Sequence, residues 1–201
     1  MVGIINYGVG NLAAIKNMLK YLGEESVITS NPYEIDQCSK LILPGVGKFD
    51  YGMNEIKKSG LKKVLDYAVL KDKKPILGIC LGMQLMLEYS EEGSCEGLGW
   101  IKGTVNRFSE DMNICVPHMG WNNISVKIDN GITNELNETD RFYFVHSYYA
   151  CPDSSLNIMF ETDYGVSFAS GICDGNILGV QFHPEKSHKY GMKLLKNFIN
   201  M

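Results

Sequence analysis

The sequence predicts an α/β protein whose central sheet is mostly parallel and flanked by helices, with an antiparallel, β-rich second half. Short apolar runs alternate with amphipathic helical patterns through the first half, which indicates crossover connections between parallel strands. After about residue 100 the pattern changes to strand-like runs linked by short turns. No internal repeat or linker-like composition interrupts residues 1–201, so we expect one domain.

The strands of the first half are apolar runs bounded by turn signals, at residues 2–7, 26–30, 40–45 and 75–80. The helices between them have apolar residues at helical spacing, over 12–23, about 53–71 and 81 to about 89. The β-rich part has strand-like runs at 102–108, 122–128, 141–150, 156–162, 165–172 and 176–183. We expect a hairpin turn at Asp174-Gly175 and a last amphipathic helix over about 187–199.

Composition argues against several classes of function. The formal net charge is −4 and Lys and Arg form no dense cluster, which disfavours nucleic-acid or anionic-membrane binding. No apolar run reaches the roughly 18 residues that cross a bilayer, and the first residues lack the basic start of a signal peptide. The six cysteines include no C-x-x-C pair, so we expect a reduced, cytoplasmic protein.

The segment YGVGNLAA (7–14) follows the first strand and matches a loose G-x-G-x-x-A pattern. A dinucleotide site of this kind needs an acid at the end of the second strand to bind the ribose hydroxyls. Ser30 and Asn31 stand there instead, so we expect no nicotinamide cofactor. The alternative is a tight strand-to-helix turn, with Asn11 capping the helix.

Cys80 lies within GICLG (78–82), where the fourth strand ends and a helix begins. This strand–G-x-C-x-G–helix arrangement has the form of a nucleophile elbow. The positive end of the helix and its unpaired amides favour a thiolate over a thiol. The alternative is a small buried hydrophobic residue, and the motif alone does not decide between the two.

His183 is the best placed of the four histidines to act as the base for such a thiolate. It ends a predicted strand, and Glu185 follows two residues later, so on an extended chain both side chains point to one side. Pro184 between them favours extended geometry at His183. Cys80, His183 and Glu185 then have the roles of a Cys–His–Glu triad, in which Glu185 fixes the tautomer of the imidazole.

Acyl chemistry also needs N–H donors that stabilise an oxyanion. The amide of Leu81, directly after the nucleophile, is one candidate. The glycine-rich turn LPGVGKF (43–49) offers another near Val46 and Gly47, because the flanking glycines allow that peptide to reorient. The alternative for this turn is a simple strand-end loop. No pair of His or Cys has the spacing of metal ligands, so we predict no metal site.

The motifs PGVG, GICLGMQ and HPE, in this order, resemble those of the class I (triad) glutamine amidotransferases. The resemblance covers essentially the whole chain, through INYGVGNL at the start and the stretches 116–122, 142–149 and 179–198. These stretches are similar to the glutaminase subunits of imidazole glycerol phosphate synthases, for which PGVG is typical. The resemblance implies a flavodoxin-like amidotransferase fold.

The resemblance also implies roles for individual residues. Cys80 would attack the side-chain amide carbon of L-glutamine, and His183 would protonate the departing ammonia, leaving a thioester that water hydrolyses. Backbone amides at Leu81 and at the Val46–Gly47 peptide would hold the oxyanion. Substrate glutamine would be bound by Gln84, Glu92 and the backbone around His146 and Ser147. A solvated helix face and a capping acid are the alternatives for the first two.

The family further implies a partner, a (β/α)8 cyclase that uses the ammonia to form imidazole glycerol phosphate and AICAR in histidine biosynthesis. Because free ammonia is partly protonated in water, we expect it to pass through a sheltered interface. Apolar and aromatic residues near the mouth of the site are interface candidates, with the core as the equal alternative: Met119, Trp121, Tyr143 and Tyr148. Lys186 would pair with an acid of the cyclase.

Three other functions compete with this one. A glutaminase of the same fold that serves a different synthase would keep every motif named above. A thiol hydrolase or peptidase would use the same elbow without a partner, but it leaves PGVG and VPHMGWN unexplained. A non-catalytic regulatory module is disfavoured because the three triad residues are intact.

Overall fold

The computed structural model describes residues 1–109, 111 and 114–201. The first half contains, in order, β1 (Val2–Ile5), α1 (Leu12–Tyr21), β2 (Ser26–Thr29), α2 (Pro32–Gln37), β3 (Lys40–Gly45), α3 (Phe49–Lys58), α4 (Leu61–Asp66), a π-helical turn (Tyr67–Lys71), β4 (Ile76–Cys80) and α5 (Leu81–Gln84). The second half contains β5 (Tyr89–Ser90), β6 (Gly103–Arg107), β7 (His118–Asn123), β8 (Ser125–Val126), β9 (Arg141–His146), β10 (Tyr148–Pro152), β11 (Ile158–Asp163), β12 (Ser167–Asp174), β13 (Ile177–Val180) and α6 (His188–Asn200).

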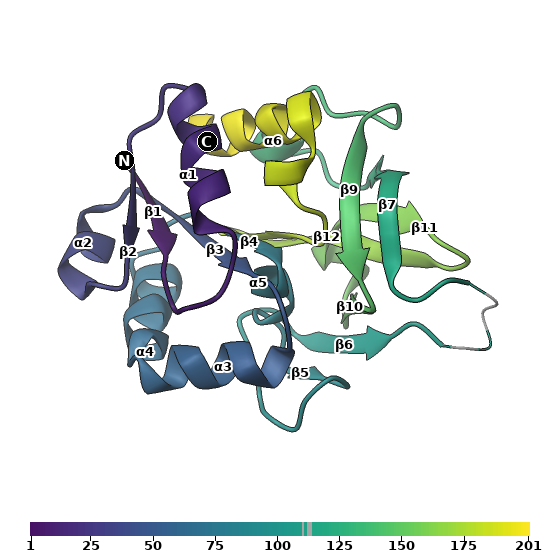
Figure 1. Cartoon of the computed structure of the whole chain (residues 1–201), viewed down its shortest axis with the longest axis horizontal. Helices are drawn as coiled ribbons and strands as arrows, with labels where there is room; N and C mark the ends of the chain where they lie inside the picture. The colour runs from purple at the N-terminus through teal and green to yellow at the C-terminus, as the bar shows by residue number, and fades with distance from the viewer. Residues whose placement is uncertain (110, 112–113) are drawn as a thin grey trace.

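The main sheet runs through the middle of the molecule with helices on both faces (Figure 1). Its strand order is β2-β1-β3-β4-β13-β12-β10-β6-β5, and β11 pairs with both β12 and β8. The five strands from β2 to β13 are parallel to one another, whereas β12, β10 and β6 pair antiparallel. The parallel part has the 2-1-3-4-5 order of flavodoxin-like folds, with β13 as its fifth strand, so the predicted fold class is confirmed.

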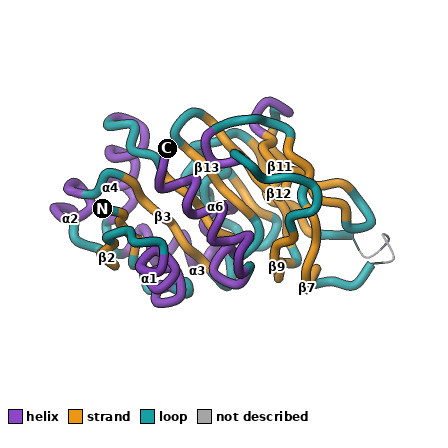
Figure 2. The backbone as a smooth tube through the Cα atoms, turned by 90° about the horizontal axis from the view of Figure 1, so that it is seen from above, coloured by secondary structure: helices purple, strands orange, loops and turns teal. Residues whose placement is uncertain are grey.

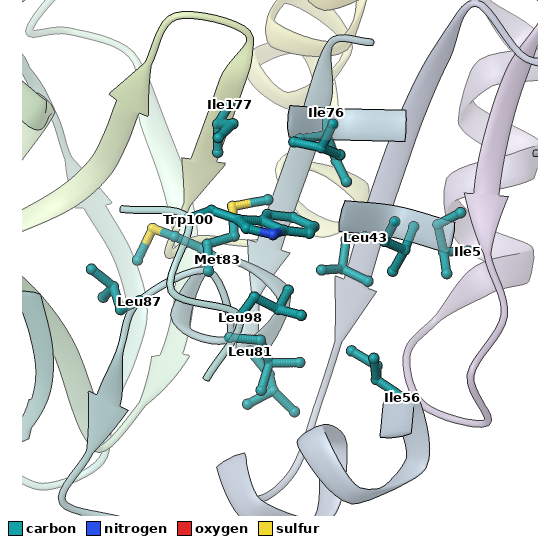
Figure 3. Packing of buried hydrophobic residues seen from close by; sticks show 14 of the residues in the cluster. Ile5, Leu43, Ile56, Ile76, Leu81, Met83, Leu87, Leu98, Trp100 and Ile177 are labelled. Atoms are coloured by element: carbon teal, nitrogen blue, oxygen red, sulfur yellow. The ribbon is translucent and has the colours of Figure 1, made fainter. Parts of the chain in front are cut away.

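Two hydrophobic clusters cover the two faces of this sheet. One contains side chains of α2, α3, α4 and α5, and the other contains side chains of α1, α6 and β9. Successive residues of a strand alternate between them, since Ile4 belongs to the second cluster and Ile5 to the first. Figure 2 looks onto the face that α1 and α6 cover. Figure 3 shows Leu81 and Met83 of α5 packed in the first cluster beside Leu43 and Trp100.

A second, two-stranded sheet lies at one end of the molecule, remote from β2 (Figures 1 and 2). It pairs β7 and β9 antiparallel, with His118 opposite His146 and Trp121 opposite Tyr143. Because β9 continues through a one-residue step at Ser147 into β10 of the main sheet, this small sheet is tied directly to the large one.

The structure corrects several predicted elements. The long helix over 53–71 is divided at Gly60, whose φ of +73° breaks the helical path between α3 and α4. The helix expected to reach residue 89 ends at Gln84, and β5 follows. Residues 32–37 form α2 rather than only a turn, because the Asn31 side chain accepts a hydrogen bond from the Tyr33 amide. Asn11 stands at the N-cap of α1 but makes no side-chain capping bond.

Candidate active site

The site forms at one edge of the sheet, where the adjacent parallel strands β3, β4 and β13 end. Gly45 in β3 is the register partner of Cys80 in β4, and Ile79 is the partner of Val180 in β13. The chain therefore leaves the sheet at three neighbouring positions. The Val46–Gly47 loop follows β3, Cys80 ends β4, and His183 comes shortly after β13. The carboxyl edge of such a sheet is where α/β proteins place their ligands.

Cys80 has the backbone geometry of a nucleophile elbow. Its φ of +54° and ψ of −112° are rare for a residue with a side chain, and they reverse the chain between β4 and α5. The glycines on either side permit this turn. A Cβ at Gly78 would lie 2.7 Å from the Met83 amide nitrogen, and one at Gly82 would overlap the carbonyl oxygen of Leu43. The backbone of Cys80 is that of an elbow, while its side chain is only 7% exposed and belongs to the second hydrophobic cluster, so the reactive role of Cys80 stays a prediction.

His183 and Glu185 form a buried pair beside Cys80. His183 Nδ1 donates to Glu185 Oε1 over 2.8 Å, and both side chains are 2% exposed. The extended geometry predicted for this pair holds only at His183, because Pro184–Lys186 form a 3-10 turn in which Pro184 occupies the first position. With Nδ1 engaged by Glu185, the other ring nitrogen, Nε2, is the one left for Cys80.

The surroundings of His183 favour its protonated form. Burial disfavours the imidazolium, but the hydrogen bond to Glu185 and the proximity of Cys80 and Glu185 outweigh it and raise the pKa of His183 to about 10. Glu185 accepts at Nδ1 and so supports a positive charge on the ring. His183 Nε2 makes no hydrogen bond within the described residues, so it is available to a group that enters beside Cys80.

A cavity of about 490 Å³ opens over these groups. It collects most of the predicted site residues, namely Val46, Gly47, Cys80, Leu81, Gln84, Glu92, His146, Ser147, Tyr148, His183 and Lys186. Glu185 lies behind His183 and does not line it. The cavity has room for a small polar molecule next to the sulfur.

The family model described as class-I glutamine amidotransferase matches residues 3–201. The chain belongs to this family. It is 49% identical over 199 residues to imidazole glycerol phosphate synthase subunit HisH 2 of Methanococcus maripaludis, covering 99% of this chain and 98% of the relative. It is 47% identical to subunit HisH 2 of Pseudomonas aeruginosa and 43% identical to subunit HisH of Leptospira interrogans, in both cases over the full length of both chains.

Solved structures agree on the fold of this amidotransferase. A crystal structure described as a glutamine amidotransferase superposes with a TM-score of 0.75 at 18% identity, covering 99% of this chain and 97% of that one. The structure of PurLQS from Thermotoga maritima gives a TM-score of 0.72 at 19% identity, over 99% of this chain and 97% of that one. These likenesses extend the fold assignment to proteins of low sequence identity.

Gln181 is a residue of the amidotransferase site that the sequence analysis missed. It is fully buried, its Nε2 lies 3.7 Å from Cys80 Sγ, and its Oε1 accepts from Gln84 Nε2 at 3.0 Å. The available signal was a glutamine within an otherwise apolar run, two residues before His183. Gln84 is itself buried rather than on a solvated face, and its Nε2 also donates to the Tyr148 carbonyl at 3.0 Å.

Glu92 also lines the cavity of the amidotransferase. Its Oε2 accepts a hydrogen bond of 3.0 Å from the Phe49 amide at the start of α3. Glu92 therefore caps α3, which is one of the two predicted roles. Burial is the main cause that raises the pKa of Glu92, and the bond from Phe49 opposes it. Because Glu92 also lines the cavity, capping and substrate binding are compatible for this residue.

Three interface candidates lie on the small sheet, outside the cavity. Met119 and Trp121 of β7 are 61% and 45% exposed, and Tyr143 of β9 packs edge-on against Trp121 with ring centroids 6.1 Å apart. The Nζ of Lys186 stands 5.6 Å over the Tyr143 ring. Since Lys186 lines the cavity, this exposed apolar face adjoins the mouth of the site.

Among the residues that the structure describes, no group of three or more His, Cys, Asp or Glu is arranged to hold a metal ion. Over the same residues, every helix is too short or too polar to cross a bilayer.

The glycine turn at 7–10 takes positive φ at Gly8 and Gly10, and a Cβ at Gly10 would lie 3.1 Å from Pro44. That contact explains the turn by close packing against β3.

Proposed function

We propose that this amidotransferase hydrolyses L-glutamine to L-glutamate and ammonia through a thioester on Cys80, and that it supplies the ammonia to a (β/α)8 cyclase. The single observation that carries the chemistry is the elbow cysteine beside the buried His183–Glu185 pair, inside a cavity large enough for an amino acid. The identity to HisH subunits of imidazole glycerol phosphate synthases supports the pathway, and the match over residues 3–201 supports a single amidotransferase domain.

The proposed reaction starts from a protonated His183 and a thiolate at Cys80. The Cys80 thiolate attacks the amide carbon of glutamine and forms a tetrahedral oxyanion. As the C–N bond breaks, the His183 imidazolium gives its Nε2 proton to the leaving nitrogen, so ammonia departs and a γ-glutamyl thioester remains. Neutral His183 then takes a proton from water, which attacks the thioester, and glutamate leaves as the thiolate–imidazolium pair is restored.

The oxyanion is stabilised by backbone amides in this proposal. The Leu81 amide is the first of α5, directly after the nucleophile, and the peptide between Val46 and Gly47 provides the second donor. Gly47 has a φ of +100° and open space around a would-be Cβ, and a glycine at this position lowers the steric cost of reorienting the peptide. We propose that the oxyanion hole is completed only when the cyclase and its ligand are bound.

Substrate glutamine is held by groups on the remaining walls of the cavity. The Glu92 carboxylate suits the α-ammonium group, and the backbone at His146 and Ser147 suits the α-carboxylate end. The amide of Gln84 faces the region between them. Met119, Trp121, Tyr143 and Lys186 form the surface that receives the cyclase, with Lys186 paired to an acid of that partner.

The testing experiment measures glutamate release from glutamine by wild type and by Cys80→Ala, each alone and with a candidate cyclase plus its nucleotide ligand. We expect strong release only from the wild-type complex with ligand bound. Equal activity of the free subunit would contradict the gated oxyanion hole. Absence of glutamate under every condition would refute the glutaminase function.

A second candidate is the same glutaminase chemistry in the service of another synthase. The groups at Cys80, His183 and Glu185 fit it equally, because they carry the glutaminase step and not the choice of ammonia acceptor. Co-purification with a barrel protein that aminates a different acceptor would select this candidate. Every step at Cys80 would stay the same.

A further inference from the structure

The imidazoles of two buried histidines have no part in the proposed chemistry, although one of these residues, His146, also lines the cavity and its backbone is assigned to the substrate carboxylate. His118 in β7 and His146 in β9 face each other across the small sheet, with 2.9 Å between His118 Nδ1 and His146 Nε2. His146 Nδ1 lies 2.8 Å from the carbonyl oxygen of Tyr148. The two residues are only 2% and 7% exposed, so their polar atoms depend on these bonds.

A single pattern of protons satisfies this chain of hydrogen bonds. The Tyr148 carbonyl can only accept, so His146 carries its proton on Nδ1 and accepts at Nε2. His118 must then donate from Nδ1 and accept at Nε2, where Asn122 Nδ2 lies 3.3 Å away. Asn122 Nδ2 also donates to the Asp163 carbonyl at 3.0 Å. Both histidines are therefore neutral and each tautomer is fixed by its neighbour.

The environment of the pair is consistent with neutral rings. His118 stacks on Phe144 and Tyr164, with centroid distances of 4.8 and 3.9 Å, and Phe168 packs against both histidines. Burial in this aromatic setting lowers the pKa of His118 to about 4 and that of His146 to about 3.

The chain continues from the histidines to the nucleophile. The Tyr148 carbonyl accepts a second bond, of 3.0 Å, from Gln84 Nε2, which donates its other proton to Gln181 Oε1. Gln181 Nε2 in turn lies 3.7 Å from Cys80 Sγ. With both Nε2 protons of Gln84 engaged, its Oε1 is the polar atom left to meet a ligand.

We propose that the neutral His118–His146 pair is a positioning element for glutamine. It holds the Tyr148 carbonyl, that carbonyl orients the Gln84 amide, and the Gln84 amide presents its oxygen to the substrate. The two imidazoles thus set the affinity for glutamine through Gln84, separately from the backbone contact assigned to His146. This inference rests on the proposed glutaminase function and assigns to it two residues that do not contact the reacting atoms.

The test compares His118→Asn with His118→Leu in the complex with cyclase and ligand. An asparagine Nδ2 takes the place of the imidazole Nδ1 and still donates to His146, whereas leucine, of similar size, cannot. We expect His118→Leu to raise the KM for glutamine about tenfold, the effect of about one lost hydrogen bond, with kcat changed less than about twofold. We expect His118→Asn to restore KM to within about twofold of wild type.

Two controls separate positioning from a general loss of stability. Phe198→Leu removes part of a fully buried side chain of α6 and should lower Tm without changing KM. Alkylation of Cys80 by iodoacetamide, which needs no glutamine pocket, should proceed within about twofold of the wild-type rate in His118→Leu. If His118→Leu does not fold, Asn122→Ala at the far end of the chain should give a smaller rise in KM, about threefold.

The outcomes distinguish this inference from the function on which it rests. A wild-type KM in His118→Leu and Asn122→Ala, or equal impairment of His118→Asn and His118→Leu, would overturn the positioning role while glutamine hydrolysis stands. A wild-type complex that neither hydrolyses glutamine nor is protected by it from alkylation would overturn both.

Discussion

Gly45 and Cys80 are register partners across the parallel strands β3 and β4. The nucleophile therefore emerges directly beside the first residue of the Val46–Gly47 loop, and no long excursion is needed to bring an amide to the oxyanion. The same edge receives His183, because β13 is the neighbour of β4 on its other side. The order of three strands thus positions the three groups that we propose as nucleophile, base and oxyanion donor.

Replacing Cys80 by alanine removes the nucleophile and should abolish glutamine hydrolysis, with a loss of at least about a thousandfold. Folding should be unaffected, because alanine is smaller and Cys80 lies at the cavity wall. Glutamate release and Tm of the same preparation provide the check. A matched variant of another buried thiol, Cys173→Ala, should retain full activity.

Glu185→Gln should reduce kcat by about a hundredfold or more, because the carboxylate no longer supports the imidazolium of His183. Glu185 is one of the groups that raise the pKa of His183, so its loss should move the alkaline limb of kcat/KM for glutamine, where the imidazolium loses its proton, to lower pH. The measurement is glutamate release by the cyclase complex across pH 5 to about 10. An unshifted profile would contradict this role.

Gly82→Ala should destabilise the protein by about 3 kcal/mol or more, because its Cβ would overlap the backbone oxygen of Leu43. Gly52→Ala in α3 is the matched control, since its nearest neighbours are leucine side-chain atoms at 3.2 Å, which can shift. Urea unfolding of the two variants should differ in midpoint. Equal midpoints would show that the elbow tolerates a backbone displacement.

Acid should destabilise the fold through the two buried histidines. Their folded pKa values, about 4 for His118 and about 3 for His146, lie below the ordinary 6.5, so between these limits the unfolded chain binds more protons. The free energy of unfolding that these two neutral histidines contribute is then fully present above about pH 6.5. It falls as the pH drops, by up to about 1.4 kcal/mol per pH unit for each histidine. Urea unfolding at several pH values should show a shallower dependence for His118→Asn.

Trp121→Ala should weaken cyclase binding by about tenfold to a hundredfold, because Trp121 is a large exposed aromatic on the face that adjoins the site. Its own stack on His188, at 5.6 Å, is on the surface, so Tm should change little. Leu156, which is 81% exposed, offers a matched control. The measurement is titration calorimetry with the cyclase. Equal affinities of Leu156→Ala and Trp121→Ala for the cyclase would contradict the assigned surface.

Much of the fold was predictable because the signals are local. The strand at 40–45 has the predicted bounds, and the turn at Gly175 joins β12 and β13 as an antiparallel hairpin. The parallel pairing of β13 with β4 could not be read from the hairpin, because it depends on a strand almost one hundred residues earlier. The division of the long helix was missed, although Gly60 was a visible breaker.

The site was predictable to the extent that its residues lie close in sequence or carry a recognisable motif. His183 and Glu185 are two residues apart, and Cys80 is framed by glycines. The His118–His146 pair instead depends on the register of β7 against β9, which no local pattern specifies. Gln181 was missed because this glutamine, which directly follows β13, acquires its role only when β13 lies beside β4.

The central place of β13 has a consequence for how the protein is made. Synthesis from the N-terminus supplies Cys80 about one hundred residues before His183, and until β13 arrives the far edge of β4 is an unpaired apolar strand. A nascent chain stopped short of residue 177 therefore exposes the edge of β4, which can pair with other chains. Its Cys80 thiol also lacks the imidazole of His183. Residues 177–201, about the last eighth of the chain, therefore complete the parallel part of the sheet and bring the imidazole of His183 to the Cys80 thiol in the same step.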